Sequence, residues 1–228
     1  MRRSPTPVIG RRTLIISAAS GLLLPVVPGL LRGLGVSRAA AQVPGIITTP
    51  AQTEGPFYPV EWAGDADNDL VQVTGEDRSA LGTVTHISGR VSDVLGVGIA
   101  GASVEIWQCD SKGVYHHPRD LGWFRKIDQT FQGRGRCATD AKGDYSFRTI
   151  RPVAYPGRTP HIHFKITIPG GNGLVTQMYV DGDPGNERDG VLNGLRDASE
   201  RAAVIVRLDP AGDREPGALA GVFNIVIA

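Results

Sequence analysis

Cysteine is nearly absent from this sequence, and so is any strong excess of one charge. Only Cys109 and Cys137 occur among 228 residues, and their number and spacing suit neither a zinc ribbon nor a disulfide-dense scaffold. Lysine and arginine number 24 against 23 acidic residues, so the formal net charge is +1. A chain without a global field is not built to bind nucleic acid or an anionic membrane surface through charge.

Helical periodicity is also scarce, and the chain contains no internal repeat. The best helix candidate covers residues 188–200, but Gly190 and Gly194 interrupt it. From Leu81 onward, short segments of alternating polarity are separated by clusters of Gly, Asp and Pro. The expected strands cover residues 84–88, 102–107, 145–150, 161–168, 174–180, 203–208 and 222–227. This pattern predicts an all-β fold, an antiparallel sandwich or barrel.

The first 41 residues read as a signal peptide. A basic start is followed by an apolar run over residues 14–31 and by the small residues Ala39-Ala40-Ala41. A membrane anchor is the alternative, but prolines and a glycine break the run. We therefore expect a periplasmic or extracellular protein with no stable membrane span after processing. Arg11-Arg12 indicates the twin-arginine route, which exports folded proteins and so allows metal loading in the cytoplasm.

Residues 42–80 are expected to form an extended, irregular N-terminal arm, and residues 81–228 a β-rich domain. The arm is rich in proline, and such arms lie across a core or a neighbouring subunit. Phe57, Tyr58 and Trp62 favour burial, which argues against a simple linker. The two cysteines either pair in an oxidising compartment or stay as separate thiols, and the sequence leaves both readings open.

The strand at residues 161–168 presents two histidines on one face. Because side chains alternate along a strand, His161 and His163 point the same way, about 7 Å apart, while Ile162 and Phe164 point the other way. In one interpretation of this pattern, the two histidines are simply exposed or hydrogen-bonded on a solvated face and bind no metal. Two imidazoles converging on one metal ion are the functional reading.

Two tyrosines strengthen the metal reading. Tyr155 and Arg158 lie in a loop rich in Pro and Gly that leads directly onto the histidine strand, and Tyr115 follows Gly113-Val114 after the strand at 102–107. Two phenolates and two imidazoles form a hard, anionic set that neutralises two of the three charges of iron(III). Zinc more usually recruits cysteine or carboxylate, and an iron(II) site would need a third histidine or an acid.

Several segments resemble intradiol ring-cleaving dioxygenases. They are residues 102–117, 135–152, 176–179, 182–184 and, most specifically, YPGRTPHIHF at 155–164. The similarity covers nearly all of the mature chain and is greatest to the protocatechuate 3,4-dioxygenase branch, given QTEGP at 52–56. It implies an antiparallel β-sandwich core with long active-site loops. It also implies a non-haem Fe(III) ion held by Tyr115, Tyr155, His161 and His163.

The resemblance further implies a reaction. A catechol or protocatechuate-like substrate and O2 would give a cis,cis-muconate-type product, with Tyr155 leaving the metal and acting as general base. Arg158 would stabilise negative charge on the substrate, and Gln177 would assist it. The sequence leaves a homo-oligomer open. The alternative is a non-catalytic envelope β-sandwich binding module, in which Tyr155 and the histidines only line a pocket.

One departure from the family bears on substrate identity. The protocatechuate branch carries a longer loop after the second tyrosine, with a tryptophan two residues on, where this chain has Gly157. An aromatic wall of the pocket is therefore missing. Residues 118–130, with Trp123, Phe124 and Arg125, either rebuild that wall or form a surface loop.

Overall fold

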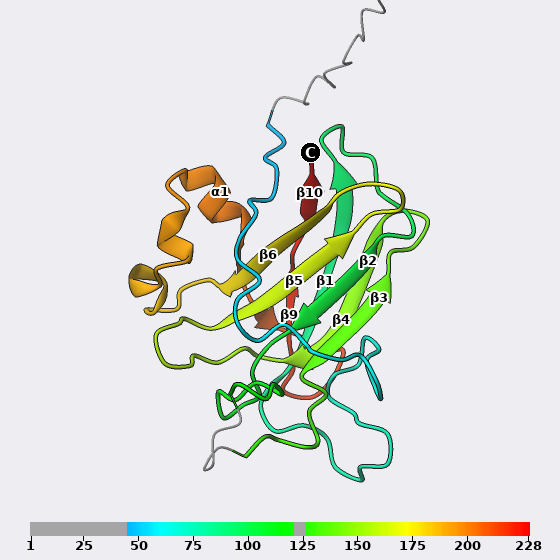
Figure 1. The fold of residues 1–228 in the computed structure, drawn as a ribbon, viewed down its shortest axis with the longest axis vertical. Coiled ribbons are helices and arrows are strands. Elements are labelled where there is room, and N and C mark those ends of the chain that lie inside the picture. The colour runs from blue at the N-terminus through cyan, green and yellow to red at the C-terminus, as the bar shows by residue number, and fades with distance from the viewer. Residues whose placement is uncertain (1–44, 121–125) are drawn as a thin grey trace, which may run out of the picture. The chain divides into compact units, whose positions relative to one another are not determined.

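Strands form nearly all of the regular structure in the computed structural model, which describes residues 45–120 and 126–228 (Figure 1). The predicted signal peptide, residues 1–41, lies outside the described residues. The strands are β1 Val84–Asp93, β2 Ser103–Trp107, β3 Arg134–Ala138, β4 Asp144–Ile150, β5 His161–Thr167, β6 Gly173–Val180, β7 Ile205–Val206, β8 Asp209–Pro210, β9 Leu219–Val222 and β10 Ile225–Ile227. In the described ranges no helix has the length and apolarity to cross a membrane.

The strands form two five-stranded sheets. One has the order β10-β1-β9-β8 with β4 also paired to β1, and the other has the order β3-β2-β5-β6-β7. The all-β prediction is right, but the sheets are mixed rather than purely antiparallel. β1 pairs in parallel with β9 and β10, and β6 pairs in parallel with β7. The long connection between β6 and β7 explains the latter, because parallel neighbours require a crossover.

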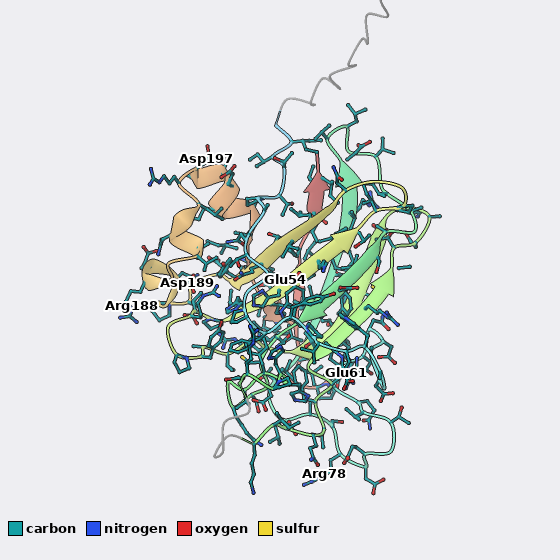
Figure 2. All side chains as sticks on the ribbon, in the orientation of Figure 1. Glu54, Glu61, Arg78, Arg188, Asp189 and Asp197 are labelled. Atoms are coloured by element: carbon teal, nitrogen blue, oxygen red, sulfur yellow. The ribbon has the colours of Figure 1, made fainter. Side chains whose placement is uncertain are left out.

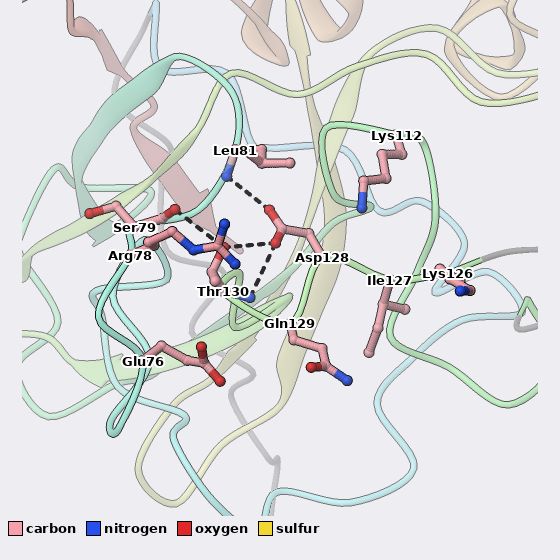
Figure 3. A pocket seen from close by; sticks show the side chains of 10 residues that line it. All are labelled: Glu76, Arg78, Ser79, Leu81, Lys112, Lys126, Ile127, Asp128, Gln129 and Thr130. Atoms are coloured by element: carbon pink, nitrogen blue, oxygen red, sulfur yellow. Dashed lines mark hydrogen bonds between the residues drawn. The ribbon is translucent and has the colours of Figure 1, made fainter.

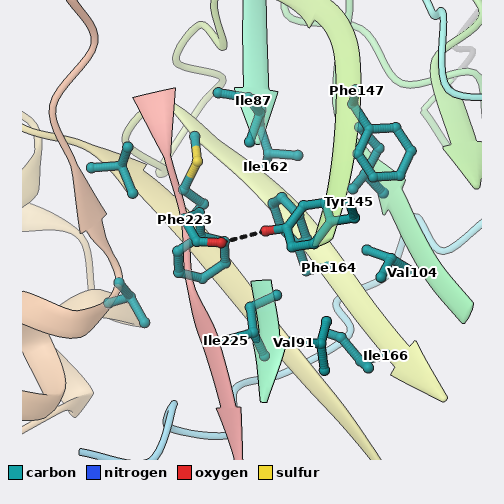
Figure 4. Close-up of a cluster of buried hydrophobic side chains, with 14 of the residues drawn as sticks. Ile87, Val91, Val104, Tyr145, Phe147, Ile162, Phe164, Ile166, Phe223 and Ile225 are labelled. Carbon is teal, nitrogen blue, oxygen red and sulfur yellow. Dashed lines mark hydrogen bonds between the residues drawn. The ribbon is translucent and has the colours of Figure 1, made fainter. Parts of the chain in front are cut away.

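Side chains from both sheets meet in one hydrophobic core (Figure 4). Ile162, Phe164 and Ile166 of β5 are fully buried and alternate with the histidines, as the period of a strand requires. The Phe164 ring meets Phe223 with centroids 5.0 Å apart, and it meets Tyr145 of β4 at 6.1 Å. Each such buried large apolar side chain contributes about 1.5–3 kcal/mol to folding. The core therefore holds β5 firmly and turns its other face toward the histidine site.

The helix expected at 188–200 is mostly wrong. The chain instead forms the 3-10 turns η1 Asn186–Arg188 and η2 Leu192–Gly194, and then α1 Ala198–Ala203. Two aspartates divide the expected helix. The Asp189 carboxylate accepts hydrogen bonds from the backbone N–H groups of Val191 and Leu192. The Asp197 carboxylate caps α1 by accepting the backbone N–H groups of its first turn. Such side-chain bonds to nearby N–H groups compete with a continuous helix, and the two glycines weaken it further.

Strand β3 has no counterpart among the expected strands, and its pairing with β2 determines whether the two cysteines can form a disulfide. Cys137 lies within β3 and pairs with Val104, whereas Cys109 lies beyond the far end of β2. Position 109 lies five residues along the chain from position 104, so an extended backbone of about 3.3 Å per residue puts the cysteines about 16 Å apart, too far for a disulfide. Both thiols are free.

The N-terminal arm lies across its own chain. Residues 45–80 contain no regular strand or helix, and the arm passes across one end of β6 (Figure 1). Near its start, the backbone N–H of Thr49 donates to the carbonyl oxygen of Val226 at 2.9 Å. Further along the arm, the backbone N–H of Gln52 donates to the carbonyl oxygen of Val175 at 2.8 Å. The first bond occupies a backbone carbonyl of β10 and the second a backbone carbonyl of β6, so the arm covers parts of two strands that would otherwise form open sheet edges.

Candidate metal centre

The two predicted histidines lie side by side on the buried central strand β5. His161 and His163 are each 1% exposed, and their Nε2 atoms are 3.2 Å apart. His161 Nδ1 lies 2.6 Å from the carbonyl oxygen of Thr159, which can only accept a hydrogen bond. The proton of a neutral His161 ring is therefore on Nδ1, and Nε2 carries the lone pair that a metal ion needs.

Both imidazoles are held in the neutral form. Burial lowers the pKa of His161 to about 4, and the nearby Arg158 charge acts in the same direction. Burial also lowers the pKa of His163 well below its ordinary value, with His161 and Arg158 adding to the shift. Metal ligation requires unprotonated imidazole nitrogens, so these histidines are prepared for it near neutral pH.

Tyr115 is fixed by the loop that follows β2. The Asp110 carboxylate accepts the N–H groups of Lys112 and Val114, and the Tyr115 N–H donates to Asp120 at 2.7 Å. The ring is 2% exposed, and its hydroxyl oxygen lies 3.4 Å from His161 Nε2. Burial raises the pKa of this phenol well above its ordinary value. A positive ion is needed for Tyr115 to lose its proton.

Tyr155 reaches the same point from a tight turn. The Arg158 N–H donates to the Tyr155 carbonyl oxygen at 2.9 Å, and Gly157 between them has φ +85°, as the third residue of a type II turn after proline requires. The Tyr155 ring centroid is 5.5 Å from that of His161 and 5.4 Å from that of Tyr115. Burial raises the pKa of Tyr155, and Arg158 partly offsets that rise. Tyr155 is only half-buried, so it is the more accessible of the two phenols.

The four predicted ligands therefore come together, and their chemistry fits iron(III). Two neutral imidazole nitrogens and two phenol oxygens would present two negative charges once the phenols lose their protons. Within residues 45–120 and 126–228, no group of three or more His, Cys, Asp or Glu side chains is placed to hold a metal ion. The oxygen-bearing side chains whose rings pack against His161 include Tyr155, and the Tyr115 hydroxyl lies 3.4 Å from His161 Nε2.

Arg158 and Gln177 lie beside this cluster and contact each other. The Arg158 guanidinium NH2 group donates to Gln177 Oε1 at 2.6 Å, and its Nε donates to Asp189 at 2.8 Å. Burial by itself raises a carboxyl pKa, but hydrogen bonds from Arg158 and the backbone hold the pKa of Asp189 below its usual value. Sequence reasoning missed Asp189, because nothing local marks it as a partner of Arg158.

Two aromatic walls also escaped prediction. Trp107 stacks on His163 with centroids 4.8 Å apart and an angle of 7° between the rings. Phe57, from the N-terminal arm, stacks on Tyr115 at 4.8 Å. The arm thus supplies an aromatic ring next to Tyr155, near the place where Gly157 leaves the pocket without an aromatic wall. The aromatic residues proposed for that role, Trp123 and Phe124, lie outside the described residues, as does Arg125.

A separate cavity of about 590 Å³ lies around Asp128 (Figure 3). The Asp128 carboxylate accepts the N–H of Leu81 and both the N–H and the hydroxyl of Thr130. None of the six predicted site residues lines it. This cavity is therefore distinct from the candidate metal centre.

Comparison with known proteins identifies the family of this chain. The family model described as "Dioxygenase" matches residues 53–228. The protocatechuate 3,4-dioxygenase beta chain of Burkholderia cepacia is 38% identical over 75% of this chain and 76% of its own length. A hydroxyquinol 1,2-dioxygenase of Corynebacterium glutamicum is 33% identical over 66% of this chain and 52% of its own length. The solved intradiol ring-cleavage dioxygenase of Tetranychus urticae is 26% identical, with a TM-score of 0.62 over 80% of this chain and 95% of that one.

Proposed function

The chain belongs to the intradiol ring-cleaving dioxygenase family, and on that premise we propose that it opens a catechol-type ring with O2 at a non-haem iron(III) ion. The product would be of the cis,cis-muconate type. One observation carries the proposal: two neutral imidazoles and two phenols converge, with the Nε2 atoms 3.2 Å apart and Tyr115 Oη 3.4 Å from His161 Nε2. The proposed partners are a catechol or protocatechuate-like molecule and O2.

The ligands have different tasks. When bound, iron(III) supplies the Lewis acidity that activates a catecholate toward dioxygen. Tyr115, His161 and His163 are almost fully buried, so they stay in place. Tyr155 is half-buried in a turn, so its phenolate can swing away and take a proton from a substrate hydroxyl at its Oη atom.

Arg158 and Gln177 act on the substrate in this proposal. The guanidinium keeps its charge at any accessible pH, and its planar shape suits an anion developing on an aromatic ring. The hydrogen bond to Gln177 and the ion pair with Asp189 hold it in one orientation. A charge held ready before the reaction stabilises the transition state without reorganisation at that moment.

Three further assignments belong to the same proposal. Residues 1–41 form an export signal of the twin-arginine type, and the mature enzyme acts in the periplasm or outside the cell. Residues 42–80 form the arm, and residues 81–228 the catalytic domain. The two sheets form a β-sandwich, which the shared core of β4, β5 and the C-terminal Phe223 supports.

Colour tests the proposed function. Tyrosinate-to-iron(III) charge transfer makes the pure mature protein reddish, and an anaerobically added catechol shifts the visible band. Tyr115→Phe weakens the colour and the retention of iron together. Tyr145→Phe, at a buried tyrosine of the core outside the site, leaves both unchanged. A colourless protein that stays inactive after iron reconstitution would instead favour the binding-module alternative.

A further inference from the structure

A continuous set of hydrogen bonds links the N-terminal arm to Arg158. It begins at Gln177, which is fully buried on β6, where it pairs with His163 of β5. The Gln177 side-chain oxygen accepts from Arg158 at 2.6 Å and from the Tyr179 hydroxyl at 3.0 Å. Its side-chain nitrogen donates to the carbonyl oxygen of Thr53, in the arm, at 2.9 Å. A flipped amide would point its nitrogen at the guanidinium and its oxygen at the carbonyl oxygen of Thr53, so Arg158 and the arm together fix its orientation.

Gln52 then decides the direction of the Tyr179 hydroxyl. Gln52 Nε2 donates to that hydroxyl oxygen at 3.0 Å, and Arg158 approaches it at 3.5 Å as a second donor. A phenol has one hydrogen, and with donors on its other sides that hydrogen must point to Gln177 Oε1. Gln52 Oε1 meanwhile accepts the backbone N–H of Gln177 at 3.1 Å. One arm side chain thus contacts both groups that orient the oxygen facing Arg158.

We propose that Gln52 is a positioning residue for ring cleavage: through Tyr179 and Gln177 it holds the Arg158 guanidinium in its productive place. The proposal rests on the proposed function, because it assumes that Arg158 acts on the substrate. It gives the arm a catalytic task in the same chain, beyond covering the edge of β6. Misplacing a catalytic group by about 1 Å can lower turnover ~100-fold.

Gln52→Glu is the sharpest test. The new carboxylate keeps an acceptor for the Gln177 N–H but removes the donor to Tyr179, so the hydroxyl turns away from Gln177. We expect kcat to fall by about tenfold, less than for loss of Arg158 itself, because one bond of several is lost. Iron content, the visible band and the anaerobic Kd for catechol stay unchanged. Glu54→Gln, two residues along the arm in a partly exposed pair with Lys165, is the matched control and keeps normal turnover (Figure 2).

Two further measurements separate positioning from general damage. In a Tyr179→Phe background, Gln52→Glu should cause little additional loss, because the relay is already broken. A crystal structure of Gln52→Glu should show Arg158 displaced from Gln177 Oε1. Turnover equal to that of Glu54→Gln, a loss that tracks iron loss, or an unmoved Arg158 would each overturn the proposal. If the wild-type protein itself lacks iron colour and ring cleavage, the proposed function fails, whereas the crystal structure still reports whether Gln52 positions Arg158.

Discussion

Arg158 has two contacts that support different roles for a single side chain. Its Nε forms an ion pair with the fully buried carboxylate of Asp189, which is what a structural brace of the loop would do. Its terminal nitrogen donates to Gln177, which pairs with His163 of β5. The side chain is only 14% exposed, so its charge is weakly screened. The ion pair of Nε with Asp189 therefore helps to orient the terminal nitrogen of the guanidinium toward Gln177.

Arg158→Ala should separate these roles. We expect iron, colour and most catechol binding to remain, while turnover falls ~100- to 1,000-fold, the effect of losing about 2.7–4 kcal/mol of transition-state stabilisation. Steady-state kinetics together with iron analysis measure this. Arg188→Ala, a nearby exposed arginine, is the control and should retain normal turnover. Loss of iron or of folding in Arg158→Ala would mean that the brace is its main task, and near-normal turnover would exclude the catalytic role.

At the scale of elements, Arg148 of β4 joins two segments far apart in the chain. Its guanidinium donates to Asp69 in the N-terminal arm and to Glu215 between β8 and β9. The side chains of Arg148 and Glu215 are 26% and 30% exposed. Hydrogen bonds from Arg148 hold the pKa of Glu215 below its usual value, with burial opposing them. The pair therefore contributes stability above the ordinary glutamate pKa of 4.5 and loses it as pH falls through the lowered folded pKa.

Arg148→Gln should lower the stability at pH 7 by about 1–3 kcal/mol, as expected for charge-assisted hydrogen bonds that are partly buried. The gap in Tm between wild type and variant should then narrow as the pH is lowered below 4.5, because the wild type loses the same contribution. Thermal unfolding from pH 7 to pH 3 measures it. Arg90→Gln, which breaks a more exposed pair with Asp144, should cost less. A gap that stays constant with pH would assign the effect to packing of the Arg148 stem.

The register of β2 and β3 makes a second prediction at this scale. Because Cys137 pairs with Val104 and Cys109 lies beyond the opposite end of β2, the mature protein should contain two free thiols. Denaturation without reductant, alkylation and intact-mass analysis should show two modified cysteines. If neither cysteine is alkylated until a reductant is added, the two cysteines form a disulfide and this register is contradicted.

Export concerns the whole molecule, including the part that the structure does not describe. If the twin-arginine route is used, Arg11→Lys together with Arg12→Lys should leave the precursor in the cytoplasm. Arg2→Lys together with Arg3→Lys is the matched control and should be exported normally. Cell fractionation with an antibody to the mature domain measures both. Normal export of the first variant would indicate the ordinary secretory route, and iron would then have to be bound after translocation.

Some of this molecule could be predicted from the sequence because the relevant physics is local. The two-residue period of a strand places His161 and His163 on one face, and Pro156-Gly157 specifies the turn that brings Arg158 next to Tyr155. The donor set of two phenols and two imidazoles follows from residue identity alone. These features need only bonded neighbours and side-chain chemistry.

Tertiary structure decided the rest, because it depends on pairing between distant segments. The registers of β2, β5 and β6 bring Trp107 and Gln177 beside His163, and no local pattern encodes a register. The same holds for Asp189, which divides an expected helix and binds Arg158, and for Phe57, whose place depends on where the arm crosses the sheet. The sequence by itself determined which side-chain atoms are available to bind a metal ion. Only the packed sheets determined what surrounds them, since long-range contacts form where burial and hydrogen bonding are satisfied across the whole fold.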